Sequence, residues 1–237
     1  GYCITWTLII PTESLGGAVG LFRVSVIKQS YPNIELIVVD DGSTDSTKDL
    51  VYSYEGDIKY IYQENKGPSS ARNMGIASAT GDFIGFLDAD DVFLKDKVEC
   101  QIKCFDENPQ LGLTYSDYYC VDKDLRIMES YRSKGFKDRK ANINGLLEKN
   151  YINTSTVLMR IDIVKDIGIF NETYKYLEDL DYWLRIAFYH DFGYINKFLV
   201  KTRSHGYNLR RQTCTRDKIN NGKEIIKKYR TILKEIE

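Results

Sequence analysis

The sequence predicts an α/β fold with one mostly parallel central sheet flanked by helices. In the first half of the chain, short apolar runs alternate with helix-like segments, which is typical of strands joined by crossover helices. The run Leu36–Val39 is continuously apolar, as expected for a parallel strand covered on both faces. A length of 237 residues suffices for one sizeable core. We therefore expect one main domain, with this run in the centre of its sheet.

Four strands and three helices are expected in the first half. The strands are predicted over residues 5–10, 35–40, 58–63 and 82–87. The first helix is predicted over 15–30, where Gly16, Gly17 and Gly20 each cost up to about 1 kcal/mol relative to alanine and loosen its start. The second helix begins within 42–46, where hydroxyl and carboxylate side chains can cap it. The third begins near Ser69 and ends by Gly81.

The alternation weakens beyond Pro109. Strands are predicted over 113–116 and 156–160, whereas 130–144 is polar, basic and without clear periodicity, and is predicted to be a mobile or acceptor-dependent loop. From Leu180 the apolar residues have the spacing of a helix with one buried face, and Asp181 and Arg185 lie at salt-bridging spacing on its polar face. The last segment has the same amphipathic pattern. We expect it to pack on the domain; contact with a partner or a membrane surface is the alternative.

The bulk composition excludes several classes of protein. With 33 basic and 34 acidic residues and a formal net charge of -1, the chain lacks the positive charge of a nucleic-acid binder. Its 5 scattered cysteines are too few for a disulfide scaffold and indicate a reducing compartment. No run approaches the roughly 20 apolar residues of a spanning helix, and residues 1–10 do not resemble a signal peptide. We expect a cytoplasmic location.

Two clusters of carboxylates directly follow predicted strands. Asp40-Asp41-Gly42-Ser43 ends the second strand, where open α/β sheets bind ligands, although turn formation is a common alternative for these residues. Asp88-Ala89-Asp90-Asp91 follows the fourth strand, and its three carboxylates repel one another unless a cation or a ligand's donors offset them. Magnesium or manganese suits such a site. Asp91 is expected to cap the following helix instead.

A third segment, residues 64–73, is a flexible turn that feeds a helix with Arg72 in its first turns. A cation near a helix start is slightly unfavourable to the helix dipole, so a structural role is less obvious than usual. An anionic nucleotide would supply the partner.

Taken in order, these segments closely resemble family 2 glycosyltransferases of the GT-A fold, whose sheet is Rossmann-like. The matching motifs are Ile9–Thr12, Gln29–Asn33, Val39–Asp45, Gly67–Asn73, Gly81–Asp82, Phe86–Asp91 and Leu177–Arg185. They cover about the first 205 residues; each is weak alone, but the ordered set is specific. The resemblance implies a domain over 1–212, with a nucleotide-binding half at about 1–110 and an acceptor-side half at about 111–212, followed by an amphipathic helix over 213–237.

The family's activity, as the resemblance implies it, is inverting transfer of a sugar from a nucleotide diphosphate donor to an acceptor hydroxyl. We expect a UDP-linked donor, a saccharide or lipid-linked acceptor, and a role in cell-surface polysaccharide or glycolipid synthesis. Peripheral contact with the cytoplasmic face of the membrane would suit such an acceptor. A sugar nucleotidyltransferase and a non-catalytic sugar- or partner-binding relative are the alternatives. The former would need a glycine-rich, basic phosphate loop after the first strand, which this chain does not have.

The resemblance also implies roles for individual residues. In the nucleotide-sugar site, Pro11 and Thr12 are implied to contact the donor, Asp41 binds the nucleobase with the help of Arg72, and Asp88 holds the ribose. Asp90 of the DxD motif binds a divalent metal that bridges the two phosphates. Such a cation stabilises the charge that builds on the leaving nucleotide. His205 falls where many relatives place a metal-binding or phosphate-facing histidine; a structural or exposed histidine is the alternative.

The Glu-Asp pair at residues 178 and 179 matches the acceptor side of the family's site. Asp179 is the implied catalytic base, which takes the proton of the acceptor hydroxyl, and Glu178 is its acceptor-orienting neighbour. A helix N-cap or first-turn carboxylate is the alternative for Asp179.

The chain departs from the family at Glu13-Ser14, where relatives usually have Tyr-Asn. The missing aromatic removes a base-stacking contribution of about 1 to 3 kcal/mol.

Overall fold

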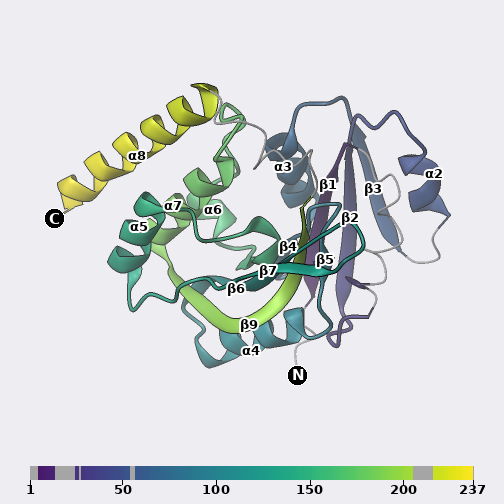
Figure 1. The fold of residues 1–237 in the computed structure, drawn as a ribbon, viewed down its shortest axis with the longest axis horizontal. Helices are drawn as coiled ribbons and strands as arrows, with labels where there is room; N and C mark the ends of the chain where they lie inside the picture. The colour runs from purple at the N-terminus through teal and green to yellow at the C-terminus, as the bar shows by residue number, and fades with distance from the viewer. Residues whose placement is uncertain (1–4, 14–24, 27, 54–56, 205–215, 237) are drawn as a thin grey trace.

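The computed structural model describes residues 5–13, 25–26, 28–53, 57–204 and 216–236. Within these residues the strands form one nine-stranded sheet in the order β3-β2-β1-β4-β8-β6-β9-β5, with β7 paired to β6 (Figure 1). The strands are β1 (Trp6–Thr12), β2 (Ile34–Asp41), β3 (Ile58–Gln63), β4 (Phe83–Phe86), β5 (Val92–Phe93), β6 (Leu111–Val121), β7 (Ile127–Tyr131), β8 (Leu158–Arg160) and β9 (Asp191–Arg203). The predicted α/β class is confirmed, because β3, β2, β1 and β4 are parallel and flanked by helices.

The helices connect and cover these strands. They are α2 (Thr47–Tyr52), α3 (Pro68–Ser78), α4 (Lys97–Glu107), α5 (Arg139–Glu148), α6 (Val164–Ile167), α7 (Glu178–Tyr189) and α8 (Arg216–Ile236), with a 3₁₀ turn η2 (Thr154–Thr156) before β8. The predicted third helix is confirmed as α3, and the helix predicted from Leu180 is α7. Most of the helix predicted over 15–30, with its three glycines, lies outside the described residues.

The core lies on both faces of the sheet. In β2, Ile37 and Val39 pack into one hydrophobic cluster with residues of α3, α5 and α7, whereas Leu36 and Val38 pack into a second cluster with residues of α2 and α4. Alternate residues of a strand point to opposite faces, so a strand covered on both must be apolar at every position. The prediction that this run is buried on both faces is therefore confirmed.

The predicted central place of this strand is wrong. β2 lies between β1 and β3, and β3 is an edge of the sheet. The sheet extends on the other side of β1 through β4, β8, β6, β9 and β5, which come mostly from the second half of the chain. A continuously apolar strand indicates that both faces of the sheet are covered there, but it does not indicate how many strands lie on either side of it.

The second half is more regular than its sequence suggested. Residues 130–144 were predicted to be a loop, yet α5 begins at Arg139, where the side chain of Asp138 accepts a hydrogen bond from the amide of Ala141 at 2.8 Å. Ile143, Leu146 and Leu147 give α5 a short buried face. The long strand β9, which pairs in parallel with β6 across several register shifts, was not predicted.

The C-terminal helix α8 packs on α7 through a buried carboxylate. Asp181, expected on the polar face of α7, is 1% exposed. It accepts hydrogen bonds from Arg185 at 3.0 Å, from Tyr229 at 2.8 Å and from Lys228 at 3.2 Å. A buried charge must be paired in this way, so Asp181 ties α8 to the helix that begins with Glu178. No helix in the described part of the chain is long and apolar enough to cross a membrane.

Candidate active site

Parallel strands bring the predicted site residues to one edge of the sheet. Thr12 at the end of β1 is paired in register with Asp40 of β2. On the other side of β1, the amide of Leu87 donates to the carbonyl of Ile9 at 3.1 Å, so the DxD motif leaves β4 beside the end of β1. Ligands of open α/β sheets bind beyond the carboxyl ends of their strands. The structure thus brings together Pro11, Thr12, Asp41, Asp88 and Asp90 at the carboxyl ends of the parallel strands.

Asp41 is buried and already accepts several hydrogen bonds. It is 1% exposed, and its carboxylate accepts from the side-chain amide of Gln63 at 2.7 Å and from the backbone amides of Lys66 and Gly67, each at 2.8 Å. Asp41 therefore fixes the turn that leads into α3. The side chain of its neighbour Asp40 accepts a hydrogen bond from the amide of Ser43 at 2.7 Å. The carboxylates of this motif therefore stabilise turns, as the alternative interpretation predicts.

The turn after Asp41 requires glycine. Gly42 has a φ of 85°, and a Cβ at this position would lie 2.8 Å from the backbone nitrogen of Asn65. Gly67 has a similar φ of 89° but nothing within 4 Å of its Cβ position. Both replacements by alanine strain the backbone, at a cost of about 1 to 3 kcal/mol. Only a Cβ at Gly42 would also clash with a neighbouring segment, the turn at Asn65 between β3 and α3.

We expect Gly42→Ala to lower the free energy of unfolding by roughly 1 kcal/mol more than Gly67→Ala, because the clash adds to the same backbone strain. Urea unfolding of the two variants measures the difference. Gly67→Ala is the matched control for strain without a clash. Equal losses in the two variants would show that the approach of Asn65 to Gly42 costs nothing to relieve.

The DxD turn is held by a network around its last carboxylate. Asp91, 2% exposed, accepts from the hydroxyl of Ser155 at 2.6 Å and from the backbone amide of Arg203 at 3.0 Å. Ser155 in turn accepts from the amide of Asp88 at 3.1 Å. The expectation that Asp91 caps the following helix is wrong: α4 begins after Asp96. Burial, with the nearby charges of Asp88 and Asp90, raises the pKa of Asp91 well above its usual range.

Arg72 joins the two sides of the site. Its guanidinium donates from Nη1 to Oε1 of Glu178 at 2.9 Å and from Nη2 to Oδ1 of Asp88 at 3.1 Å, and it lies 5.5 Å from the ring centre of Phe170. Arg72 is 5% exposed, so both pairs are shielded from bulk water on its side. Burial favours a lower pKa for Arg72, but the carboxylates of Asp88 and Glu178 outweigh it and the pKa is raised. Burial and the charge of Asp179 likewise raise the pKa of Glu178 despite the pairing with Arg72.

Asp179 is half-buried in the first turn of α7. Its Oδ2 accepts from the side-chain amide of Asn150 at 2.9 Å, and its Oδ1 accepts from the amide of Leu180 at 2.8 Å. The N-cap is Leu177, with a φ of 62° and no side-chain cap, so Asp179 is a first-turn carboxylate and not the cap. Glu178 and Asp179 therefore follow a strained residue, in the kind of backbone that is found at functional sites.

Two residues that hold this site, Asn150 and Ser155, had no motif by which to find them. Both lie in a polar segment before β8, and each acts on a carboxylate far away in the sequence. The only available signal was the density of amide and hydroxyl side chains over residues 150–156.

A divalent metal fits the residues at the strand ends. His205 lies outside the described residues, and the part of the chain that is described contains no group of three or more His, Cys, Asp or Glu side chains suited to a metal. A magnesium or manganese ion on a diphosphate needs only one or two protein carboxylates. Asp90 is half-buried beside Asp88, whose side chain is 43% exposed. Of these, Asp90 is the carboxylate implied for the metal, and its oxygens are of the hard type that magnesium and manganese prefer, whereas Asp91 is turned inward.

Known proteins with similar sequences are glycosyltransferases. Residues 22–168 match the family model described as glycosyl transferase family 2. An uncharacterized glycosyltransferase of Rickettsia conorii is 34% identical over 184 residues, which are 77% of this chain and 30% of that protein. The Escherichia coli protein named UDP-Glc:alpha-D-GlcNAc-diphosphoundecaprenol beta-1,3-glucosyltransferase WfaP is 35% identical over 167 residues, 68% of this chain and 62% of that protein. The chain thus spans less than two thirds of the length of either relative.

Solved structures share the fold at low sequence identity. S. aureus TarS 1-349 in complex with UDP-GlcNAc has a TM-score of 0.79 at 21% identity, over 95% of this chain and 66% of that one. The mannosyltransferase PcManGT from Pyrobaculum calidifontis, in complex with GDP-Man and Mn2+, has a TM-score of 0.66 at 19% identity, over 87% of this chain and 59% of that one. With the strand-end carboxylates and the family match, these likenesses give one conclusion: the chain belongs to glycosyl transferase family 2 and has the GT-A fold.

Proposed function

We infer that the protein transfers a sugar, with inversion, from a UDP-linked donor to a hydroxyl of a lipid-linked saccharide, in cell-surface polysaccharide or glycolipid synthesis at the cytoplasmic face of the membrane. The observation that carries this proposal is the bridge by Arg72 between Asp88 and Glu178, at 3.1 and 2.9 Å. It joins a carboxylate of the DxD motif to one on the acceptor side. The name of WfaP, which specifies a UDP-Glc donor and a diphosphoundecaprenol acceptor, and the UDP-GlcNAc bound to TarS support the substrate classes.

The donor side is built from the strand ends. Pro11 and Thr12 border the base, and Asp41 shapes the base pocket by holding the turn at Lys66 and Gly67. Asp88 receives the ribose while it is held by Arg72. Asp90, with His205 as a candidate second ligand, would hold a manganese or magnesium ion on the diphosphate. When bound, that ion would stabilise the charge on the leaving UDP.

The acceptor side performs the proton transfer. The acceptor oxygen attacks the anomeric carbon from the side opposite the diphosphate, the bond to the phosphate oxygen breaks with its electron pair, and the acceptor proton passes to a carboxylate oxygen of Asp179. Asn150 orients that carboxylate at 2.9 Å. Arg72 fixes Glu178 so that it can accept a hydrogen bond from another hydroxyl of the acceptor.

Asp90→Asn tests the donor half of the proposal. We expect this variant to lose the manganese-stimulated part of UDP-sugar turnover, a fall on the order of 100-fold, because Lewis-acid assistance supplies several kcal/mol. It should also lose the rise in melting temperature that manganese adds to the effect of UDP. Turnover of UDP-glucose and UDP-GlcNAc, with thermal unfolding in parallel, provides the two readouts.

Asp96→Asn is the matched control, since Asp96 is an exposed carboxylate five residues past Asp91 and makes no capping hydrogen bond. It should behave as the unmodified protein. If manganese stimulated Asp90→Asn as strongly as the unmodified protein, the metal site would not include Asp90. UDP binding without turnover in the unmodified protein, across donors and lipid-linked acceptors, would favour a non-catalytic relative.

A further inference from the structure

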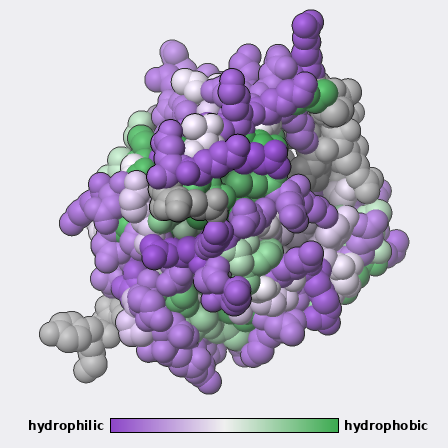
Figure 2. Space-filling model, turned by 90° about the vertical axis from the view of Figure 1, so that its left-hand side faces the viewer, coloured by the Kyte–Doolittle hydropathy of each residue, from purple (hydrophilic) through white to green (hydrophobic). Residues whose placement is uncertain are grey.

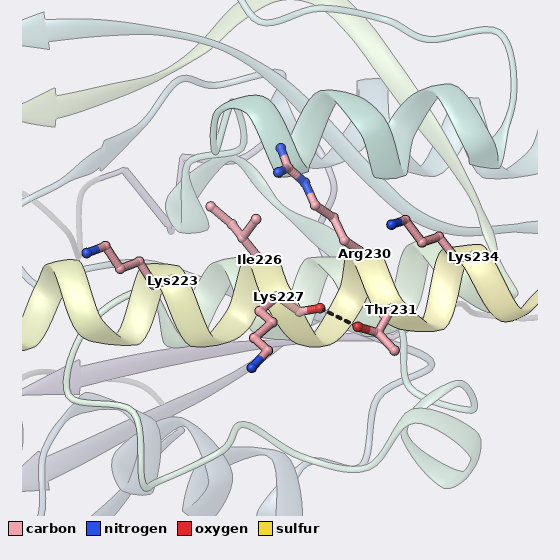
Figure 3. Close-up of a pocket in the computed structure, with 6 residues that line it drawn as sticks. All are labelled: Lys223, Ile226, Lys227, Arg230, Thr231 and Lys234. Atoms are coloured by element: carbon pink, nitrogen blue, oxygen red, sulfur yellow. Dashed lines mark hydrogen bonds between the residues drawn. The ribbon is translucent and has the colours of Figure 1, made fainter.

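A basic groove runs along the outer side of α8, away from the carboxylate site. It has a volume of about 410 Å³ and is lined by Lys223, Ile226, Lys227, Arg230, Thr231 and Lys234, which Figure 3 shows along the helix. We call this set the basic groove. None of its described lining residues is acidic. Its four cations are all exposed, so their charges face solvent.

The four cations form one stripe because of their spacing. Lys223, Lys227, Arg230 and Lys234 stand at i, i+4, i+7 and i+11, which brings them to one side of a helix with 3.6 residues per turn. The stripe is not a reflection of the overall composition. α8 contains seven basic and three acidic residues, a net charge of +4. Since the whole chain has a formal net charge of -1, the rest of it carries -5.

The apolar side of α8 is occupied by the protein itself. Ile225 and Tyr229 are 0% and 2% exposed, and Tyr229 stacks on Phe188 of α7. The helix therefore cannot turn this side into a bilayer without leaving its domain. Figure 2 views the side of the molecule that bears α8, and this surface is mostly hydrophilic, with hydrophobic residues only in patches between hydrophilic ones. Attraction at this face is thus electrostatic and does not depend on insertion.

The neighbouring helix does not cancel the charge. α5 lies beside α8 in Figure 1 and has two exposed basic residues, Arg139 and Lys140, and one exposed acidic residue, Glu148. On α8 itself, two exposed acids adjoin the stripe in sequence, Glu224 after Lys223 and Glu235 after Lys234. Glu224 accepts a hydrogen bond from Tyr174 of the body of the protein at 3.1 Å. The lining of the groove itself is therefore of one sign, and the basic residues of α8 outnumber its acidic ones. A partner that complements it must be anionic and extended along about three helical turns.

We propose that the basic groove docks the protein on the anionic phospholipid headgroups of a bilayer. Each Lys or Arg side chain that lies near an anionic leaflet raises the constant for partitioning of the protein onto the membrane about fivefold. The negative remainder of the chain is repelled by the same surface, so this face alone approaches it. A nucleic acid also presents phosphates, but the net charge of -1 disfavours it as the partner.

Docking through α8 would also orient the acceptor side of the site. Lys228 and Tyr229 hold Asp181 in the first turn of α7, next to Glu178 and Asp179. Gly222 lies against Leu177, because a Cβ on it would come within 3.2 Å of the Leu177 side chain. A helix fixed on the bilayer is therefore rigidly connected to the proposed base. This consequence rests on the proposed lipid-linked acceptor, whereas the docking itself does not.

Flotation of the full 237-residue chain with vesicles tests the proposal. We expect it to bind vesicles with 30% phosphatidylglycerol in phosphatidylcholine, not to bind pure phosphatidylcholine, and to be released as salt rises. The variant Lys223→Gln/Lys227→Gln/Arg230→Gln/Lys234→Gln should bind the anionic vesicles on the order of 100-fold more weakly. The control variant replaces Lys48, Lys95, Lys103 and Lys123, four exposed lysines on other elements, by glutamine and should keep its binding.

Several outcomes overturn the docking. They are equal binding to neutral and anionic vesicles, equal weakening in the two variants, and full binding by the groove variant. Groove-dependent binding to a DNA duplex without vesicle binding would assign the surface to nucleic acid. Thermal unfolding of both variants checks that they fold. Because flotation needs no donor and UDP-sugar turnover in detergent needs no vesicle, failure of the docking and failure of the proposed activity are distinguishable.

Discussion

Replacing Asp179 by Asn should lower the rate of sugar transfer by roughly 10²- to 10⁴-fold while leaving UDP binding unchanged. The amide keeps the shape of the carboxylate but has one acceptor oxygen, so it keeps only one of the hydrogen bonds from Leu180 and Asn150. It also cannot take the proton of the attacking hydroxyl. The proposed donor site, at the ends of β1, β2 and β4, is formed by other elements, so the UDP-induced rise in melting temperature should persist. Steady-state transfer rates and thermal unfolding with UDP measure the two quantities.

Two further variants make this test specific. Asn150→Ala removes the hydrogen bond that orients Asp179 at 2.9 Å, and a local one from the amide of Ile152 at 3.2 Å, but it leaves the carboxylate of Asp179 in place. We therefore expect a smaller fall, about tenfold, in the same rate. Asp162→Asn replaces an exposed carboxylate before α6 and should have no effect. A transfer rate of Asp179→Asn within threefold of the unmodified enzyme would remove Asp179 as the base. A fall caused by misfolding would also abolish the UDP response.

Lys97 should make the stability of the protein rise with pH above neutrality. This lysine is fully buried, and its ammonium donates to Oε1 of Gln101 at 2.6 Å and lies 4.2 Å from the ring centre of Phe93. No carboxylate among the described residues is close enough to form an ion pair with it. Burial lowers the pKa of Lys97 from its usual 10.5 to about 7. The difference corresponds to roughly 4 to 5 kcal/mol of free energy.

The direction follows from the protons that each state binds. Between about pH 7 and 10.5 the unfolded chain keeps Lys97 protonated whereas the folded protein does not, so the free energy of unfolding increases with pH across this range. Below about pH 7 the folded protein must hold a buried charge, and the full destabilisation is present. We expect Lys97→Met to lose this slope, by about 2 kcal/mol between pH 7 and 9.

Urea unfolding of the unmodified protein and of Lys97→Met at pH 7, 8 and 9 measures the difference in slope. The comparison of slopes is needed because methionine also leaves Gln101 without its donor, which shifts the absolute stability at every pH. Lys103→Met, on the exposed side of the same helix, is the matched control and should keep the slope of the unmodified protein. Parallel pH profiles for Lys97→Met and the unmodified protein would contradict a neutral Lys97 in the folded state.

The sequence by itself determined the features that depend on neighbouring residues. Leu36–Val39 is apolar at every position because both faces of β2 are covered, and this required no knowledge of which strands flank it. The carboxylates after β2 and β4 come to one edge because parallel strands end there together. The ordered motifs were sufficient to predict the family and the fold. The assignments of Asp90, Asp179 and His205 to metal and catalysis stay predictions.

Only the tertiary structure decided how those residues are paired. Asp91 looked like a helix cap, but it is turned inward by Ser155 and by the amide of Arg203, 64 and 112 residues away in the sequence. The sequence did not indicate the protein partners of Arg72, which bridges Asp88 and Glu178 because α3 and α7 are brought together on the same face of the sheet. α5 and β9 form because their weak apolar patterns are completed by contacts with distant elements. Local patterns encode burial and turn chemistry, whereas the partner of a charge depends on which distant segments the folded chain brings within about 3 Å of it.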